Sequence, residues 1–228
     1  MQPYFFPYVG YFQLINEVDV FVLYDDVNFF KRGWMNRNNI LVNQAPHLLT
    51  IPCKKVSQNK FINEVQVNLD QKTTDKLLTK FKMAYRKAPY FDDVYPLIED
   101  VLRAGDETIA ELSGRSIRKV LEYLELPVIL KESSKHYNNR QFKKADRLID
   151  ICHREGISEY VNMIGGKELY TKNYFKERGI DLYFLIPEAF PYRQFSDHFV
   201  PWLSILDVLM FNDKQTTKEK LLSASGLE

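Results

Sequence analysis

The sequence has few of the features that mark secreted, metal-binding or membrane-spanning proteins. It contains only two cysteines, Cys53 and Cys152, which lie far apart and in no CxxC pattern. This argues against a disulfide framework or a cysteine zinc site, and we expect a reducing, cytoplasmic location. No apolar run approaches the roughly 20 residues of a membrane span. The first residues also lack the basic start and small-residue cleavage site of a signal peptide.

An excess of charge of one sign is also missing. The chain has 31 Lys and Arg residues against 30 Asp and Glu, for a net charge of +1. We therefore expect no nucleic-acid partner, because no global electrostatic attraction would favour one. The histidines show no metal-ligand spacing, so we expect no transition metal, whereas an aspartate pair could hold magnesium through water. No Ser-His-Asp order, Cys-His pair or HExxH motif is present.

Aromatic residues, in contrast, are abundant, and the chain opens with "MQPYFFPYVGYF". A rigid, aromatic segment at a terminus is unusual, because termini are commonly the least ordered part of a chain. Phe5 and Phe6 could simply be core residues, with the prolines shaping a turn. Alternatively, the segment is a ligand-binding loop in which Gln2 and Tyr11 are polar groups and Gly10 allows close backbone approach.

Hydrophobic periodicity predicts an α/β fold. Residues 1 to about 68 are expected to be mainly β after a first helix at 11–18, and 69–126 to be helical, with Asp70 as an N-cap. Beyond that, strands alternate with helices, which is typical of a parallel sheet. We expect one α/β domain over 1–228, with a mainly parallel, Rossmann-like sheet, a helical insertion at 69–126 and a β-hairpin extension at one edge. The expected strands are 19–26, 40–42, 47–53, 62–68, 126–130, 158–164 and 180–186, the first and the last three forming the parallel sheet.

Two acidic residues end the first apolar strand, at the position where ligands bind in open α/β sheets. Because neighbouring side chains of a strand point to opposite faces, we expect at most one of Asp25 and Asp26 to enter a given pocket. Asp25, Asp26 and Lys31 are the catalytic candidates, and the following arginines suit phosphate. The alternative is a charged surface loop with weak ion pairs. The polar and aromatic residues after the carboxylates are Lys31, Arg32, Trp34, Asn36 and Arg37.

A second candidate lies where a strand at 158–164 runs into Gly165-Gly166-Lys167 and a helix. Free backbone N–H groups at a helix N-terminus attract anions. The motif is neither GxGxxG nor a P-loop, so a tight turn with a solvated lysine is an equal alternative.

Several of these motifs together closely resemble the WbqC-like protein family, and the resemblance covers essentially the whole chain. The residues Met-Ile-Gly-Gly at 163–166 depart from it, since relatives often read more like Ser-Gly-Pro there. The spacing of Tyr8-Val9-Gly10-Tyr11 is similar, by analogy only, to the HxGH segment of nucleotidyltransferases, which makes a nucleotidyltransferase-like sheet a second option. The motifs are "MQPYFFPYVGYFQLINEVDVFVLYDDV", "KRGWMNRN", "ADRLIDICHREGISEYVNMIGGKELY", Tyr192-x-Gln194 and "WLSILDVLMFN".

The resemblance implies an enzyme of bacterial surface-polysaccharide (O-antigen-type) biosynthesis. It implies a transferase or ligase that acylates or aminoacylates a nucleotide-linked amino sugar, or alternatively a non-catalytic nucleotide-sugar-binding or scaffold protein of the same pathway. No cofactor is identified; ATP and magnesium are the candidates left open. The residues expected to bind the nucleotide sugar or another anionic ligand are Gln2, Pro7, Gly10, Tyr11, Arg32, Trp34, Asn36, Arg37, Gly165, Gly166, Lys167 and Gln194.

Overall fold

In the computed structural model, which describes residues 1–222 and 226–228, parallel strands pair two by two in a mixed α/β fold. β1 (Val20–Val22) pairs with β4 (Ile129–Lys131), and β5 (Glu159–Met163) pairs with β6 (Asp181–Leu185). The expected parallel pairing is confirmed within each pair, but the expectation of one sheet of all four strands is wrong within the described residues, where the two pairs are separate. The other edge of β1 is taken by Met1, whose carbonyl accepts the Tyr24 N–H at 2.7 Å. The Rossmann-like and nucleotidyltransferase-like sheets are not established by this pairing.

The expected hairpin forms from β2 (Arg37–Val42) and β3 (Ala45–Thr50). Its two turn residues, Asn43 and Gln44, have φ angles of 49° and 62°, as a type I′ turn requires. The strand expected at 62–68 is instead a 3-10 helix, η1 (Ile62–Glu64), followed by isolated bridges. Residues 66 and 67 pair one at a time with different neighbours, so no continuous ladder develops.

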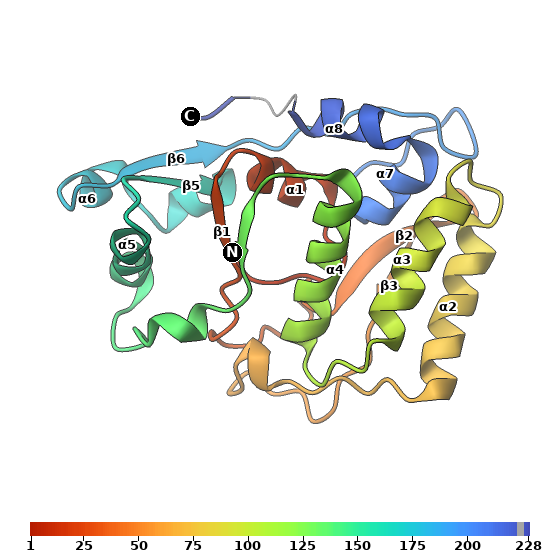
Figure 1. Cartoon of the computed structure of the whole chain (residues 1–228), viewed down its shortest axis with the longest axis horizontal. Helices are drawn as coiled ribbons and strands as arrows, with labels where there is room; N and C mark the ends of the chain where they lie inside the picture. Colours follow the sequence, from red (N-terminus) through yellow and green to blue (C-terminus); the bar gives the residue numbers. More distant parts are fainter. Residues whose placement is uncertain (223–225) are drawn as a thin grey trace.

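Three helices follow, as expected for residues 69–126. α2 (Gln71–Tyr85), α3 (Phe91–Arg103) and α4 (Ile109–Leu124) lie side by side, with α2 at one end of the molecule and α4 toward its middle (Figure 1). Asp70 caps α2, since its carboxylate accepts the Thr73 N–H at 2.7 Å. The buried faces of these helices belong to the same hydrophobic core as the aromatic opening segment.

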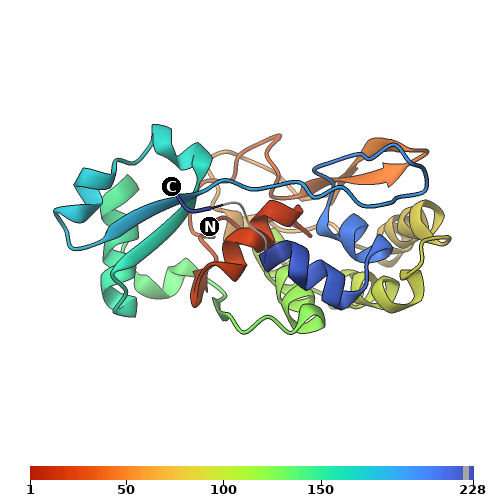
Figure 2. The ribbon, with the colours of Figure 1, turned by 90° about the horizontal axis from the view of Figure 1, so that it is seen from above.

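The opposite end of the molecule holds β5 and β6 with α5 (Lys144–Glu155) and α6 (Lys172–Lys176) (Figures 1 and 2). These elements enclose a second, smaller core. Gly156, at a φ of 69°, ends α5 in the left-handed conformation that glycine adopts most readily. The core residues are Ile149, Cys152, Phe175, Ile180, Leu182 and Phe184.

Three further helices cover the middle of the fold: α1 (Val9–Asn16), α7 (Ile205–Phe211) and α8 (Lys214–Leu222), with α1 packing against α8. The end of the chain returns to β6, where Glu228 exchanges two backbone hydrogen bonds with Phe184. Among the described residues, no helix combines the length and apolar character needed to cross a membrane.

The aromatic opening segment is held by packing and by three buried polar side chains. Phe6 is fully buried at a φ of 39°. Its carbonyl accepts hydrogen bonds from Asn38 Nδ2 at 2.5 Å and Ser204 Oγ at 2.7 Å, and its N–H donates to Ser116 Oγ at 2.9 Å. Residues from β2, α4 and the start of α7 therefore converge on one peptide of the opening segment, and this explains why this terminus is ordered.

Candidate functional site

The carboxyl ends of β1 and β4 bring together two carboxylates and two serines. Because the strands are parallel neighbours, the residues that follow them emerge at the same edge. Ser133 Oγ lies 2.8 Å from each carboxylate oxygen of Asp25, and the Ser134 N–H donates to Asp25 Oδ1 at 3.0 Å. We call Asp25, Asp26, Ser133, Ser134 and the neighbouring Arg147 the carboxylate–serine cluster.

Both carboxylates converge on one hydroxyl, that of Ser134. Its Oγ hydrogen-bonds to Asp26 Oδ1 and lies 3.3 Å from Asp25 Oδ1. The expectation that the two carboxylates face opposite sides is therefore wrong. β1 ends at Val22, so the alternation of a strand no longer applies at positions 25 and 26.

The cation of the cluster is Arg147 of α5, which is not among the predicted site residues. Its Nη2 lies 2.5 Å from Asp26 Oδ2, its Nε donates to Asn139 Oδ1 at 2.9 Å, and its guanidinium lies 4.7 Å from the Tyr24 ring centroid. An arginine among the apolar positions of an amphipathic helix is the signal that could have identified it, since such a residue is rarely buried without a partner. α5 buries Arg147 together with Ile149, Ile151 and Cys152.

The cluster can act as a proton acceptor. Both aspartates are buried, while Ser133 is half-buried and is the hydroxyl of the cluster nearest to solvent. A carboxylate that already accepts a hydroxyl proton is placed as a general base would be. The arrangement does not suit magnesium, because serine, asparagine and arginine donors already bind the carboxylate oxygens; Asn63 Nδ2, for example, lies 3.3 Å from Asp25 Oδ2.

The basic turn predicted to bind phosphate lies apart from this cluster. Lys31, Arg32 and Trp34 are exposed. Arg37 folds back, with its Nε 3.2 Å from the Gly33 carbonyl. Within residues 1–222 and 226–228, no hydrogen bond or ion pair joins Lys31 or Arg37 to either aspartate. A shared cavity for these groups thus stays a prediction.

Asn36 at the end of that turn also bonds within the protein, since its Nδ2 donates to the Ile51 carbonyl at 2.8 Å. It holds the turn against the residue that follows β3. To bind a ligand through its Nδ2, Asn36 would have to replace this hydrogen bond with one to the ligand.

The predicted ligand residues of the opening segment contact the protein itself. Tyr11 is fully buried, and its hydroxyl donates to the Gln2 carbonyl at 2.9 Å, so this polar group forms a hydrogen bond within the opening segment. The Pro7 carbonyl accepts the backbone N–H of Ile205 at 2.8 Å. A Cβ on Gly10 would lie 2.4 Å from Tyr8 Cε2, so this glycine does permit a close approach, to the Tyr8 ring.

The glycine pair forms part of a 3-10 helix, η3 (Ile164–Glu168), that precedes α6. Lys167 forms an ion pair with Glu228. A Cβ on Gly166 would lie 2.6 Å from Asn162 Nδ2, whereas Gly165 has open space. Anion binding at Gly165, Gly166 and Lys167 stays a prediction, and the lysine would have to leave its present partner.

Gln194 lies in a second buried network, centred on Asp207 of α7. Asp207 accepts hydrogen bonds from Gln194 Nε2 at 2.7 Å, the Tyr192 hydroxyl at 2.6 Å and the Tyr85 hydroxyl at 2.9 Å. Burial raises the pKa of the Asp207 carboxyl. The network ties the long connection between β6 and α7 to α2. Within "WLSILDVLMFN", the single acid in an apolar run was the available signal for it.

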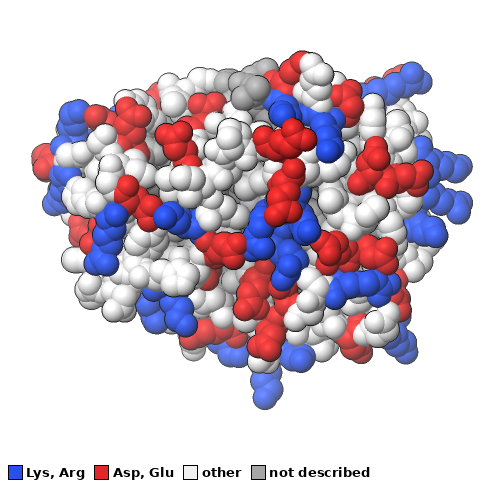
Figure 3. Space-filling view, in the orientation of Figure 1, with Lys and Arg blue, Asp and Glu red and all other residues white. Residues whose placement is uncertain are grey.

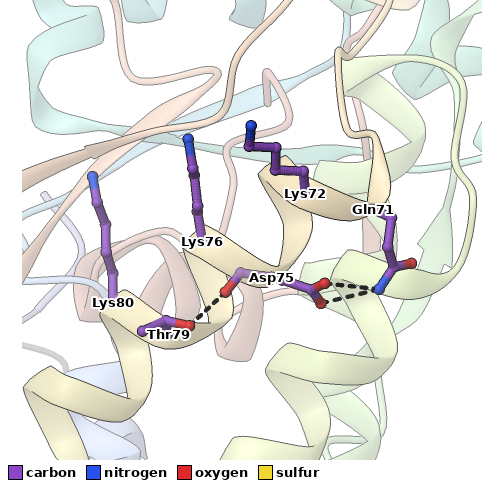
Figure 4. A pocket seen from close by; sticks show the side chains of 6 residues that line it. All are labelled: Gln71, Lys72, Asp75, Lys76, Thr79 and Lys80. Carbon is purple, nitrogen blue, oxygen red and sulfur yellow. Dashed lines mark hydrogen bonds between the residues drawn. The ribbon is translucent and has the colours of Figure 1, made fainter.

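The surface offers a shallow hollow elsewhere, of about 670 Å³, over the outer face of α2 (Figure 4). On the face seen in Figure 3, acidic and basic side chains are interspersed over the middle of the molecule. The hollow includes no residue of the carboxylate–serine cluster.

Comparisons with known proteins agree with the motifs. The model of the WbqC-like protein family matches residues 2–219. The chain is 26% identical over 220 residues to "Uncharacterized protein Rv1507c" of Mycobacterium tuberculosis, and the match covers 93% of this chain and 91% of that protein. No solved structure matches the chain. Because the family model spans nearly its whole length, the chain belongs to the WbqC-like protein family.

Proposed function

We propose that this protein is an enzyme of bacterial surface-polysaccharide biosynthesis, a transferase or ligase that acylates or aminoacylates a nucleotide-linked amino sugar. The observation that carries the proposal is the Ser133 hydroxyl lying 2.8 Å from both oxygens of Asp25 at the ends of two adjacent parallel strands. Ligands of α/β proteins bind at such ends. Membership of the WbqC-like family supports the choice of substrate class.

In the proposed reaction the sugar amine attacks the carbonyl carbon of an activated acyl or aminoacyl donor. A C–N bond forms, the bond from that carbon to the leaving group breaks, and the amine proton passes to Asp25. The substrate amine would take the place of the Ser133 hydroxyl as the hydrogen-bond donor to Asp25. Arg147 neutralises Asp26, whereas among the described residues no lysine or arginine side chain forms an ion pair with Asp25, whose charged neighbour is the buried amine of Met1.

The second candidate is a non-catalytic nucleotide-sugar-binding or scaffold protein of the same pathway. One observation favours it: protein donors already bind the oxygens of both aspartates, as in a purely structural network. In that case Asp25 and Asp26 would only join the ends of β1 and β4 to α5.

Turnover separates the two candidates. The purified protein would be incubated with uridine- and thymidine-diphosphate-linked amino sugars and with acyl or aminoacyl donors, with and without ATP and magnesium, and products followed by mass spectrometry. A product of matching added mass supports the enzyme. Saturable calorimetric binding across the same panel without any product supports the binding protein. The absence of both binding and product would contradict both candidates.

A further inference from the structure

The outer face of α2 carries a row of lysines that point the same way (Figure 4). Lys72, Lys76 and Lys80 recur every four residues, which places them on one side of the helix. The opposite side, with Leu77 and Phe81 among others, is buried in the main core. α2 is therefore firmly attached to the protein while its basic side faces outward. We call the exposed residues Lys72, Lys76, Lys80, Lys82, Arg86 and Lys87 the basic face.

The charge of this segment differs from that of the whole chain. Residues 71–87 include the six cations of the basic face and one acid, Asp75, while the full chain has a net charge of only +1. Asp75 is paired with Arg103 of α3 at 2.9 Å. Among the described residues, no ion pair involves any of the six cations. Asp70, the N-cap of α2, interacts electrostatically with Lys72 and Lys76, so the positive charge of the face is compensated only in part.

Neighbouring helices show the ordinary pattern of a solvated surface. On α4, Arg115 pairs with Asp106 at 2.8 Å and Lys119 with Asp100 at 2.6 Å. Charges of both signs alternate over this part of the surface, whereas basic side chains project from the right-hand edge, where Figure 1 places α2 (Figure 3). A solvated helix does not require six unpaired cations on one side.

An exposed apolar side chain accompanies the cations. Met83 is 76% exposed and lies on the same side of α2 as Lys76 and Lys80. Its flexible thioether side chain is suited to adaptable apolar contacts. A surface with many cations and one apolar group matches the boundary between lipid headgroups and acyl chains.

We propose that the basic face docks the protein on an anionic lipid bilayer through the headgroup phosphates. Clusters of four to eight basic residues on one side of a helix bind anionic membrane surfaces. Lysine acts as a point charge without the fixed bidentate geometry of arginine, which favours a diffuse anionic plane over one precisely held phosphate. α2 lies at one extremity of the molecule (Figures 1 and 2), which favours approach by a planar surface.

The proposal is tested by sedimentation of the full chain with vesicles of phosphatidylcholine alone or mixed with phosphatidylglycerol. We expect binding only to the anionic vesicles, and weaker binding as salt is raised. Each lysine near the surface contributes about fivefold to partitioning, so Lys72→Glu/Lys76→Glu/Lys80→Glu should lower it by about 100-fold or more. Met83→Ser should lower it by a smaller factor.

The matched control is Lys143→Glu/Lys172→Glu/Lys214→Glu, which makes the same change of net charge at exposed lysines on other elements. It should retain most of the binding, and both triple variants should melt near the wild-type temperature. Equal loss in the two variants, equal binding to neutral vesicles or no binding to either vesicle would overturn the proposal. If the protein bound duplex DNA or an acidic protein through these lysines but did not bind vesicles, the basic face would be assigned to that partner instead.

Discussion

Arg147 and Asp26 form a buried ion pair between residues 121 positions apart, with Nη2 2.5 Å from Oδ2. Their side chains are only 6% and 3% exposed. The pair joins α5, and with it the smaller core, to the end of β1. Loss of this pair should therefore affect both the stability of the fold and the geometry of the proposed site.

Replacing Arg147 by methionine should lower the free energy of unfolding by about 3 kcal/mol, because Asp26 would remain buried without its cation. Urea unfolding measures the change. Arg103→Met is the matched control, since Arg103 pairs with Asp75 and Glu99 on an exposed surface; such pairs contribute up to about 1 kcal/mol. The double variant Arg147→Met/Asp26→Asn should recover part of the loss. Equal effects of the Arg147 and Arg103 variants would contradict this interpretation of the buried pair.

Asp207 should make stability depend on pH in the acid range. Burial raises its pKa above the ordinary 3.8. Between the unfolded and folded pKa, the folded protein holds a proton that the unfolded chain has released, so the free energy of unfolding falls as pH rises through this interval. Asp207→Asn should flatten this part of the profile in urea titrations, whereas Asp92→Asn, at an exposed position of α3, should leave it unchanged. Parallel profiles for wild type and Asp207→Asn would show that Asp207 does not contribute.

Gly10→Ala should destabilise the fold by about 2 kcal/mol, because overpacking forces neighbours to move. The added Cβ would lie 2.4 Å from Tyr8 Cε2 and 2.7 Å from Pro187 Cβ. Gly165→Ala is the control, since no atom lies within 4 Å of its added Cβ. Thermal melting compares them. A smaller effect at position 10 than at position 165 would contradict the close packing of the opening segment.

Arg37→Ala tests the predicted phosphate ligand of the exposed turn. Within the part of the chain that the structure describes, the Arg37 side chain makes one hydrogen bond, to the Gly33 carbonyl, so its loss should cost the fold about 0.5 kcal/mol. If it binds phosphate bidentately, affinity for uridine diphosphate should fall by about 2 kcal/mol in calorimetry. Arg193→Ala, at an exposed arginine of the connection between β6 and α7, is the control. A large drop in melting temperature with unchanged affinity would make Arg37 structural.

The sequence predicted local elements well and their long-range assembly poorly. Asp70 and the hairpin turn act through neighbours in the chain, so their roles follow from residue type. The parallel pairing of β1 with β4 was expected, but the placing of Ser133 beside Asp25 depends on a contact more than 100 positions apart, which periodicity does not contain. The strand expected at 62–68 was wrong for the same reason, because its partners decide whether a ladder forms.

The candidate site was predicted in part. Asp25 and Asp26 were selected because they end an apolar strand, and the structure places them with Ser133 and Ser134. Arg147 was not predicted, because Lys31 and Arg37 are the cations close to Asp25 and Asp26 in the sequence. The cations that lie near the two aspartates in the sequence are on an exposed turn. The cation that contacts Asp26 in the fold is Arg147, on α5, far along the chain.

The most direct test of the central claim is the transfer rate of Asp25→Asn against that of Asp92→Asn, measured on the nucleotide-linked amino sugar and donor that the wild-type protein turns over. Loss of a general base lowers a rate by about 10²- to 10⁴-fold. We predict a loss of that size for Asp25→Asn in protein that melts cooperatively with unchanged binding of the sugar nucleotide, and a wild-type rate for Asp92→Asn. Wild-type transfer by folded Asp25→Asn would contradict the assignment of Asp25 as the catalytic base.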